Sequence, residues 1–118
     1  AICHIYYPAL VDFATKGEFN GFWKNKDIIK FLPEDEYTRK YIRASYYIDK
    51  KNRRCLLIFG NTGKDRKEIE VKIDWDKIGL NKNKIVMRDL GTRQVYEDKL
   101  KFEIKGENVR FIIVSERR

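Results

Sequence analysis

The stretch from residue 41 to residue 59 limits the fold of this chain more than any other feature, because its hydrophobic pattern fits a β-hairpin. In the first half, every second residue would lie on one buried face of a strand: Ile42, Ala44, Tyr46 and Ile48. The run from Cys55 to Phe59 is apolar at every position, as expected for a strand in the centre of a sheet. Turn-forming residues separate the two halves at Asp49–Asn52. The sequence therefore predicts a hairpin that forms the centre of a β-sheet.

Further candidate strands lie on both sides of this hairpin. We expect them at residues 27–32, 69–73, 84–87, 93–96, 99–105 and 109–114. One helical turn interrupts them, because Asp74 can cap it and Gly79 can end it in a left-handed conformation. Short strands with turn residues about every ten positions are typical of an antiparallel sandwich or barrel. We predict an all-β fold, an antiparallel, Greek-key-like β-sandwich, in one domain over residues 1–118.

The N-terminal segment is expected to be short and irregular. Residues 2–7 would form an edge strand that ends at Pro8, and residues 9–15 would form a short helix. Met87 is the only methionine and the chain opens with Ala1, so we expect that a preceding part has been removed. We interpret the chain as a domain cut from a longer protein.

The composition limits the class of protein. With 118 residues, of which 42% are hydrophobic, the chain can bury a core without a disulfide or a metal ion. No apolar run approaches the roughly 20 residues of a membrane-spanning helix, so no membrane partner is expected. The residues Cys3, His4 and Cys55 have no metal-ligand spacing. Cys55 lies in an apolar run and is predicted to be a buried free thiol, although the redox state of the two cysteines stays open.

Catalytic groups are scarce in this chain. His4 is the only histidine, and its neighbour Cys3 would point to the opposite face of a strand, so the two are not expected to form a nucleophilic dyad. Acid–base hydrolysis of a glycosidic bond needs two carboxyl groups about 5 to 9 Å apart in a shielded cleft. Glu34–Glu36 are expected in a solvated acidic turn, and Glu68 and Glu70 on the polar face of a strand. We predict no catalytic residue, no cofactor-binding residue and no metal ligand.

The formal net charge of +8 favours a polyanionic partner. Basic runs at Lys24–Lys26 and Lys50–Arg54, with tyrosines nearby, could form the groove of a nucleic-acid-binding β-barrel. However, lysine and arginine alternate with glutamate and aspartate along the strands, which is typical of a solvated face. We therefore keep nucleic-acid binding as an alternative and do not expect it.

Aromatic residues are the remaining candidates for a binding role. Phe19, Phe22 and Trp23 lie within five residues of one another, beside Gly21. Such rings could contact a neighbouring domain, or they could pack against the apolar face of a sugar ring. The same residues would leave an apolar surface through which the isolated chain associates with itself. We predict an inter-domain or sugar contact at Phe19, Phe22 and Trp23.

The order of the motifs resembles that of a known class of domain. The segments that carry the resemblance are Phe19–Asn25, Ile42–Tyr47, Arg54–Gly63, Val71–Leu80, Arg88–Thr92 and Val109–Val114. They resemble the C-terminal β-sandwich that follows the catalytic (β/α)₈ barrel in many glycoside hydrolases. The likeness is greatest to enzymes of the family 123 type, which act on N-acetylgalactosaminides, and the C-terminal sandwiches of α-amylases and α-galactosidases are similar. It spans about residues 19–114.

The resemblance implies an excised, C-terminal, non-catalytic accessory domain of a carbohydrate-active enzyme. Its partner would be the catalytic barrel of the parent protein, and the parent would be secreted or periplasmic. The catalytic carboxylates of such enzymes lie on the barrel, so no catalytic role is carried over to this chain. A carbohydrate-binding module and a basic polyanion-binding barrel stay as alternative functions.

Overall fold

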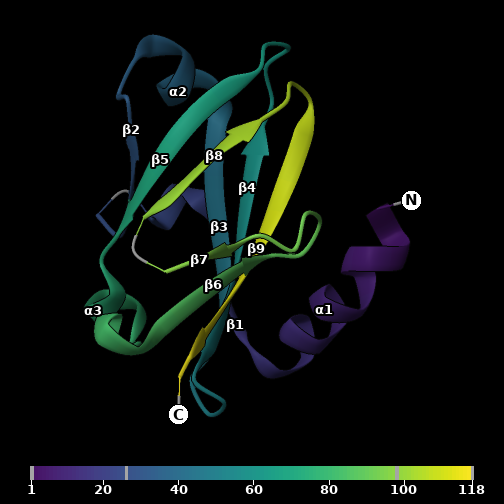
Figure 1. The fold of residues 1–118 in the computed structure, drawn as a ribbon, viewed down its shortest axis with the longest axis vertical. Helices are drawn as coiled ribbons and strands as arrows, with labels where there is room; N and C mark the ends of the chain where they lie inside the picture. The colour runs from purple at the N-terminus through teal and green to yellow at the C-terminus, as the bar shows by residue number, and fades with distance from the viewer. Residues whose placement is uncertain (1, 26, 98, 118) are drawn as a thin grey trace.

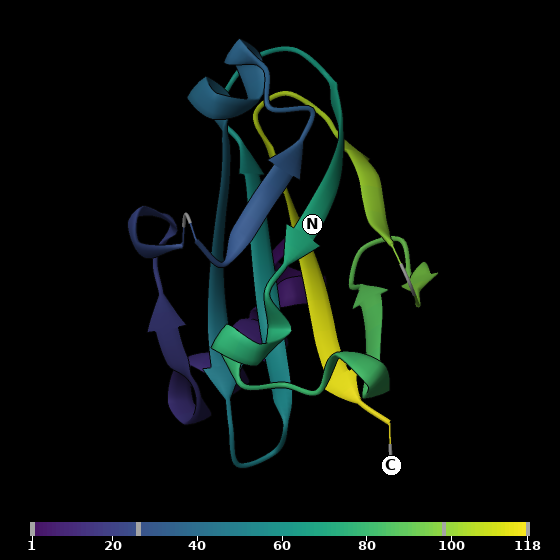
Figure 2. The same cartoon turned by 90° about the vertical axis from the view of Figure 1, so that its left-hand side faces the viewer.

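The computed structural model describes residues 2–25, 27–97 and 99–117, and for residues 2–7, 9 and 24 it describes the backbone alone. Two antiparallel sheets pack face to face, and a helix lies on the outer side of the larger sheet (Figures 1 and 2). The helical elements are α1 (Ile2–Lys16), α2 (Glu36–Tyr41) and α3 (Trp75–Ile78), with 3₁₀ turns η1 (Phe22–Lys24) and η2 (Lys82–Lys84). The predicted antiparallel β-sandwich is confirmed.

Within the described residues, the larger sheet has six strands in the order β1-β3-β4-β9-β6-β7. Their bounds are β1 Glu18–Asn20, β3 Ile42–Asp49, β4 Arg54–Asn61, β6 Ile85–Asp89, β7 Val95–Tyr96 and β9 Asn108–Glu116. The predicted hairpin is confirmed, because β3 and β4 pair from Ile42 opposite Asn61 to Asp49 opposite Arg54. Since β9 pairs with the other edge of β4, strand β4 lies inside the sheet.

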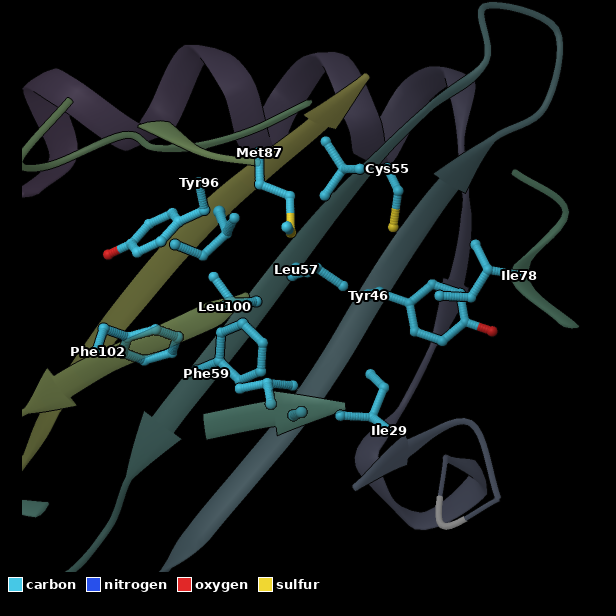
Figure 3. Packing of buried hydrophobic residues seen from close by; sticks show 14 of the residues in the cluster. Ile29, Tyr46, Cys55, Leu57, Phe59, Ile78, Met87, Tyr96, Leu100 and Phe102 are labelled. Carbon is cyan, nitrogen blue, oxygen red and sulfur yellow. The ribbon is translucent and has the colours of Figure 1, made fainter. Parts of the chain in front are cut away.

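The smaller sheet consists, in the described part of the chain, of three strands in the order β2-β5-β8. Their bounds are β2 Ile29–Leu32, β5 Lys67–Ile73 and β8 Leu100–Ile104. The chain passes from β4 in one sheet to β5 in the other, and it returns from β8 to β9, which inserts between β4 and β6. The main core fills the space between the sheets, where Leu57, Phe59 and Phe102 are buried side by side (Figure 3).

The segment that covers the outer face of the larger sheet differs from the one predicted from the sequence. The segment predicted to be short and irregular, with a strand over residues 2–7, is instead the helix α1, which continues through Pro8. Phe13 of this helix is 1% exposed and packs on Leu56 and Phe111 of the sheet. Packing between elements outweighs the local preference for a strand and the helix-breaking effect of proline. The predicted strand over residues 2–7 is therefore wrong, whereas the predicted helix over residues 9–15 is confirmed as the second half of α1.

Two short helices begin at aspartate caps. Asp74 accepts a hydrogen bond from the backbone N–H of Lys77, and Gly79 ends α3 with a φ of 103°, as predicted. Asp35 accepts a hydrogen bond of 2.8 Å from the backbone N–H of Thr38 and so begins α2. The expected acidic turn at residues 34–36 is thus the start of a helix. The expectation of a purely solvated turn is wrong, because a capping carboxylate satisfies a free N–H group of the first helical turn.

Candidate functional site

The three aromatic residues singled out in the sequence lie together at the edge of the larger sheet. We call Phe19, Phe22 and Trp23 the aromatic patch; their exposed fractions are 45%, 44% and 62%. The ring centroid of Trp23 lies 5.3 Å from that of Phe22 and 6.4 Å from that of Phe19, in edge-to-face arrangements. Phe19 also packs on Tyr47, at 4.9 Å between centroids. The chain therefore presents a contiguous apolar surface, and its role as a contact stays a prediction.

Gly21 determines where the Trp23 ring can lie. Gly21 is buried, and a Cβ atom at this position would lie only 2.6 Å from two carbons of the indole ring. Only glycine therefore allows the ring to pack so closely against the backbone. Because one side of the indole covers Gly21 while the residue is largely exposed, the other side of the ring faces water.

A cleft of about 700 Å³ opens beside the aromatic patch. Four elements form it: η1, the edge strand β2 of the smaller sheet, α2, and β3 of the larger sheet. Its lining residues are Phe22, Trp23, Asn25, Ile29, Lys30, Phe31, Glu34, Thr38, Arg39, Ile42, Arg43 and Ala44. Volumes of roughly 300 to 1,000 Å³ are typical of small-molecule sites in proteins. The cleft is therefore the candidate binding site of this chain.

Asn25 is a buried polar residue in the lining of the cleft. It is 3% exposed, and its Nδ2 group donates hydrogen bonds to the backbone oxygens of Ala44, at 2.9 Å, and Asn20, at 3.2 Å. Because both partners are carbonyl acceptors, the amide nitrogen must face them, and this fixes the amide orientation. Among the described residues, Oδ1 of Asn25 has no hydrogen-bond partner. A buried acceptor without a donor is unfavourable, so a donor from a ligand would stabilise it.

The charged residues of the lining are mainly basic. Lys30, Arg39 and Arg43 stand against the single carboxylate of Glu34 in the described lining. Arg39 donates through Nη1 to the backbone oxygen of Glu34 at 2.6 Å, and Arg43 donates through Nη1 to that of Arg39 at 2.7 Å. The guanidinium of Arg43 also lies 5.4 Å from the ring centroid of Phe22. These contacts hold the arginines while leaving other guanidinium N–H groups for a ligand.

An ion pair between Asp35 and Lys67 attaches α2 to the smaller sheet. Lys67 donates to one carboxylate oxygen of Asp35, and the N-terminal turn of α2 donates to the other through Thr38. These hydrogen bonds, that from Lys67 first, hold the pKa of Asp35 well below its usual range. One wall of the cleft is therefore tied to β5.

The carboxylates considered for catalysis do not meet in the cleft. Glu68 pairs with Lys101 at 3.1 Å and Glu70 with Lys72 at 3.4 Å, on the outer side of the smaller sheet. Of the acidic residues, only Glu34 is found in the described lining of the cleft. Acid–base hydrolysis of a glycosidic bond generally uses a pair of carboxyl groups, of which the described lining holds one.

The structure describes the side chain of one of the two cysteines and most of the side chains that could bind a metal ion. Cys55 is a buried free thiol, as predicted, and burial raises its pKa. The candidate dyad of Cys3 and His4 lies in α1, but those two side chains are outside the described residues. Among the residues whose side chains are described, namely 8, 10–23, 25, 27–97 and 99–117, no group of three His, Cys, Asp or Glu residues could hold a metal ion. Nor does that part of the chain contain a helix with the length and apolarity needed to cross a membrane.

Sequence reasoning found the aromatic patch but missed the cleft. Three aromatic residues within five positions are a visible signal, whereas Asn25 and Arg39 reach the site only through the folding of η1 and α2. The sequence had also suggested that basic runs could form a nucleic-acid groove. In the second of these runs, Arg53 pairs with Glu116, and Arg54 pairs with Asp49 and Asp12; the nucleic-acid groove stays an untested alternative.

The comparisons with known proteins concern the fold alone. Neither the protein-family models nor the curated sequences give a match to this chain. Solved structures do match: a protein assigned as an α-N-acetylgalactosaminidase from Bacillus halodurans has a TM-score of 0.50 at 14% identity. α-Galactosidase I from Mortierella vinacea has a TM-score of 0.50 at 13% identity. A GH27 β-L-arabinopyranosidase from Geobacillus stearothermophilus, solved with arabinose, has a TM-score of 0.50 at 12% identity.

The aligned region is a large share of this chain but a small share of each solved chain. It covers 75% to 76% of this chain but only 20% to 23% of the solved chains. The chain thus spans about one fifth of the length of these enzymes. At such low identity the likeness establishes a shared sandwich fold.

Proposed function

We propose that this chain is an accessory β-sandwich domain of a glycoside hydrolase, and that it supports a catalytic domain without carrying out hydrolysis itself. One observation carries the proposal: the fold matches about a fifth of the length of three glycoside hydrolases. The motif order in the sequence independently suggested the same class. That order suggested family 123, whereas one of the three solved enzymes is of family GH27, so the proposal is made at the level of glycoside hydrolases.

The aromatic patch is the proposed contact with the catalytic domain. Phe19 packs on Tyr47, which borders the outer cluster beneath α1, so the patch extends from the cleft to the outer side of the larger sheet. Exposed aromatic residues are frequent anchors of protein interfaces. A neighbouring domain that packs on Phe19 and on the sides of Phe22 and Trp23 that face away from the cleft would remove this part of the apolar surface from water and leave the cleft open.

The absence of hydrolysis can be tested directly on the chain. Nitrophenyl α-galactoside, α-N-acetylgalactosaminide and β-L-arabinopyranoside are suitable substrates, since the solved enzymes are named for these sugars. We expect no turnover above the buffer rate. Turnover that a single substitution, such as Glu34→Gln, abolishes would overturn the proposal.

The accessory role itself is tested by sequencing the reading frame around the segment. We expect it to encode a (β/α)₈ barrel in the same polypeptide, and removal of residues 19–117 should then lower the thermal stability of that barrel. A frame without a catalytic domain, or a barrel whose stability does not change on this removal, would contradict the proposal.

A further inference from the structure

The cleft beside the aromatic patch has features that domain packing does not require. It combines a largely exposed indole ring, a buried amide oxygen without a partner among the described residues, and an excess of cations in its lining. We propose that this cleft binds one pyranose ring that carries a carboxylate. The proposal rests on the residues of this chain and does not depend on the accessory role.

The indole of Trp23 supplies the surface for the ring. One side of the indole is held against Gly21, and the residue is 62% exposed. The axial C–H groups of a pyranose form an apolar face that can pack on the free side of an aromatic ring. Phe22, whose centroid is 5.3 Å away, extends this surface toward Arg43.

Asn25 indicates that the ligand carries hydroxyl groups. Its amide nitrogen is occupied by Ala44 and Asn20, so only Oδ1 is left for a ligand, and Oδ1 can only accept a hydrogen bond. A sugar hydroxyl is such a donor, and it can also accept a hydrogen bond from a second group. Because Oδ1 itself is buried, a hydroxyl would reach it only when neighbouring side chains of the lining move aside on binding.

The cations indicate a carboxylate on the same ligand. Lys30, Arg39 and Arg43 line the cleft against Glu34 alone among its described acidic residues. Arginine N–H groups bind a carboxylate in a fork geometry, and charge-assisted hydrogen bonds are stronger than neutral ones. Arg39 is exposed and lies in the last turn of α2, in the lining of the cleft, where a carboxylate on the ring could reach it.

The test is a nuclear magnetic resonance titration of the chain with a matched pair of sugars, methyl glucuronide and methyl glucoside. The signals to follow are the indole Nε1–H of Trp23 and the side-chain amide of Asn25. We expect saturable shifts of both signals with the glucuronide, and a dissociation constant at least about fivefold lower than that for the glucoside. Equal binding of both sugars, or no saturable shift with the glucuronide, would overturn the proposal.

Two pairs of variants locate the site. Trp23→Ala should abolish saturable binding, whereas Trp75→Phe should not, because Trp75 lies outside the cleft. Arg39→Gln should remove the preference for the glucuronide, whereas Arg66→Gln, which changes an exposed arginine elsewhere, should keep it. Binding that survives Trp23→Ala would show that the sugar binds at another place, and a preference that survives both Arg39→Gln and Arg43→Gln would show that the arginines of the cleft do not bind the carboxylate.

A third variant and a control ligand remove the remaining ambiguities. Gly21→Ala keeps Trp23 but displaces its ring, so it should weaken binding at least about fivefold in a protein with native chemical shifts elsewhere. Sodium acetate at the same concentrations provides the carboxylate without the ring, and it should not saturate the Trp23 signal. Saturation by acetate alone, or full binding by the Gly21→Ala variant, would overturn the assignment of a sugar.

Discussion

The two faces of the larger sheet are buried by different structures, although they belong to the same strands. The inner face is covered by the three-stranded sheet, and its side chains join a large cluster that includes Leu57 and Ile112. The outer face is covered by the helix α1, and its buried cluster consists of Phe13, Leu56 and Phe111. Leu56 and Leu57 are adjacent and both 0% exposed, yet they belong to different cores. The buried state of a side chain therefore does not show which secondary-structure element packs on it.

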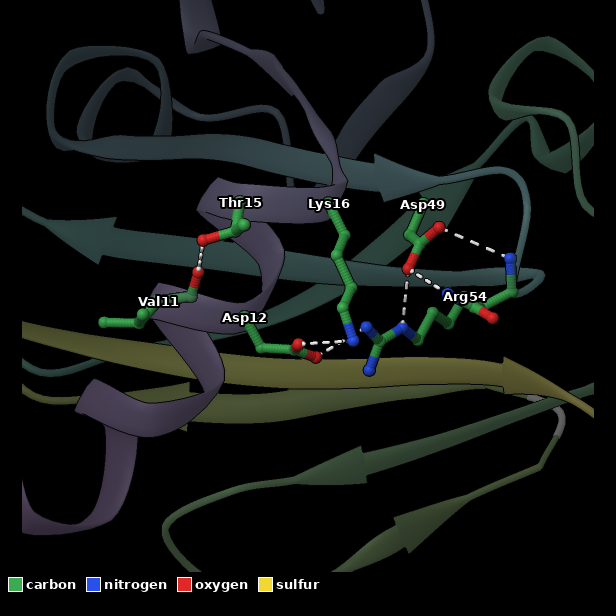
Figure 4. A network of polar contacts seen from close by, with 7 residues as sticks. Val11, Asp12, Thr15, Lys16, Asp49 and Arg54 are labelled. Atoms are coloured by element: carbon green, nitrogen blue, oxygen red, sulfur yellow. Dashed lines mark hydrogen bonds and ion pairs between the residues drawn. The ribbon is translucent and has the colours of Figure 1, made fainter.

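The difference lies in how firmly each cover is attached. The chain crosses between the two sheets at each of the connections β1–β2, β2–β3, β4–β5, β5–β6, β7–β8 and β8–β9. The helix α1 is attached by Phe13 and by polar contacts of Arg54, whose guanidinium lies 4.5 Å from the Phe13 ring centroid. Arg54 donates to Asp49 at 2.9 Å and also to Asp12 of the helix, which in turn pairs with Lys16 at 3.0 Å (Figure 4). Fewer contacts mean that α1 should open locally before the sandwich unfolds.

The inner core should give the largest effect on stability. Leu57→Ala leaves a cavity between two sheets whose strands are held by paired backbones, so the surroundings can relax little. We expect a loss of about 3 to 5 kcal/mol in the free energy of unfolding, measured by urea denaturation. A loss below about 1 kcal/mol would mean that the inner core is loosely packed, and the proposed contrast between the faces would fail.

The outer core should respond less to the same change. Leu56→Ala removes the same atoms next to α1, and the helix can move toward the gap. We expect a loss of about 2 to 3 kcal/mol in the same urea experiment, together with faster amide exchange in residues 10–16. An equal or larger loss than for Leu57→Ala would show that α1 is as rigid a cover as the smaller sheet.

The inner face was predictable from the sequence and the outer cover was not. Alternation in β3 and the apolar run in β4 correctly placed the hairpin in the centre, because a period of two is a local property. The same run also indicated that both faces of β4 are covered, but not by what. The first residues have a strand-like composition and contain Pro8, and contacts with a distant sheet, such as those of Phe13 and Asp12, stabilise the helix.

The same distinction applies to the candidate site. The aromatic patch was visible because Phe19, Phe22 and Trp23 are close in sequence, but the cleft beside it was not. The position of Asn25 depends on the backbone oxygen of Ala44, which lies 19 residues away in the chain. A contact between residues so far apart in the sequence is formed only in the folded chain, so the sequence pattern around Asn25 does not reveal the cleft.

The attachment of α1 should also depend on pH. Asn52 first and then Arg54 lower the pKa of Asp49, and Lys16 first and then Arg54 lower that of Asp12. A carboxylate with a lowered pKa in the folded state stabilises that state above its unfolded pKa, near 3.8, and this stabilisation is lost as the pH falls through the folded value. As the pH falls from about 4 to 2, the protection factors for amide exchange in residues 10–16, corrected for the intrinsic exchange rate at each pH, should therefore fall more than those in β4.

A substitution tests the cause of this pH effect. Asp12→Asn should lower the protection factors of residues 10–16 at pH 7 and make them nearly independent of pH, because the titrating partner of Arg54 on the helix is gone. The matched control is Glu116→Gln, since Glu116 also has a lowered pKa but pairs with Arg53, away from α1. If the control changes exchange in α1 as much as Asp12→Asn does, the ion pairs of Arg54 are not what holds the helix.

The smallest effect on stability is expected at the aromatic patch, which belongs to neither core. Trp23 is 62% exposed, so Trp23→Ser should change the free energy of unfolding by less than about 0.5 kcal/mol. If the patch is a contact surface, the isolated chain should associate with itself through it, and the variant should be monomeric in sedimentation velocity. Val109→Ser, at a residue that is 40% exposed elsewhere, should leave the association unchanged. A loss of several kcal/mol with unchanged association would instead assign Trp23 to the packing of the sandwich, because a tryptophan that only covers a surface does not stabilise the fold to that extent.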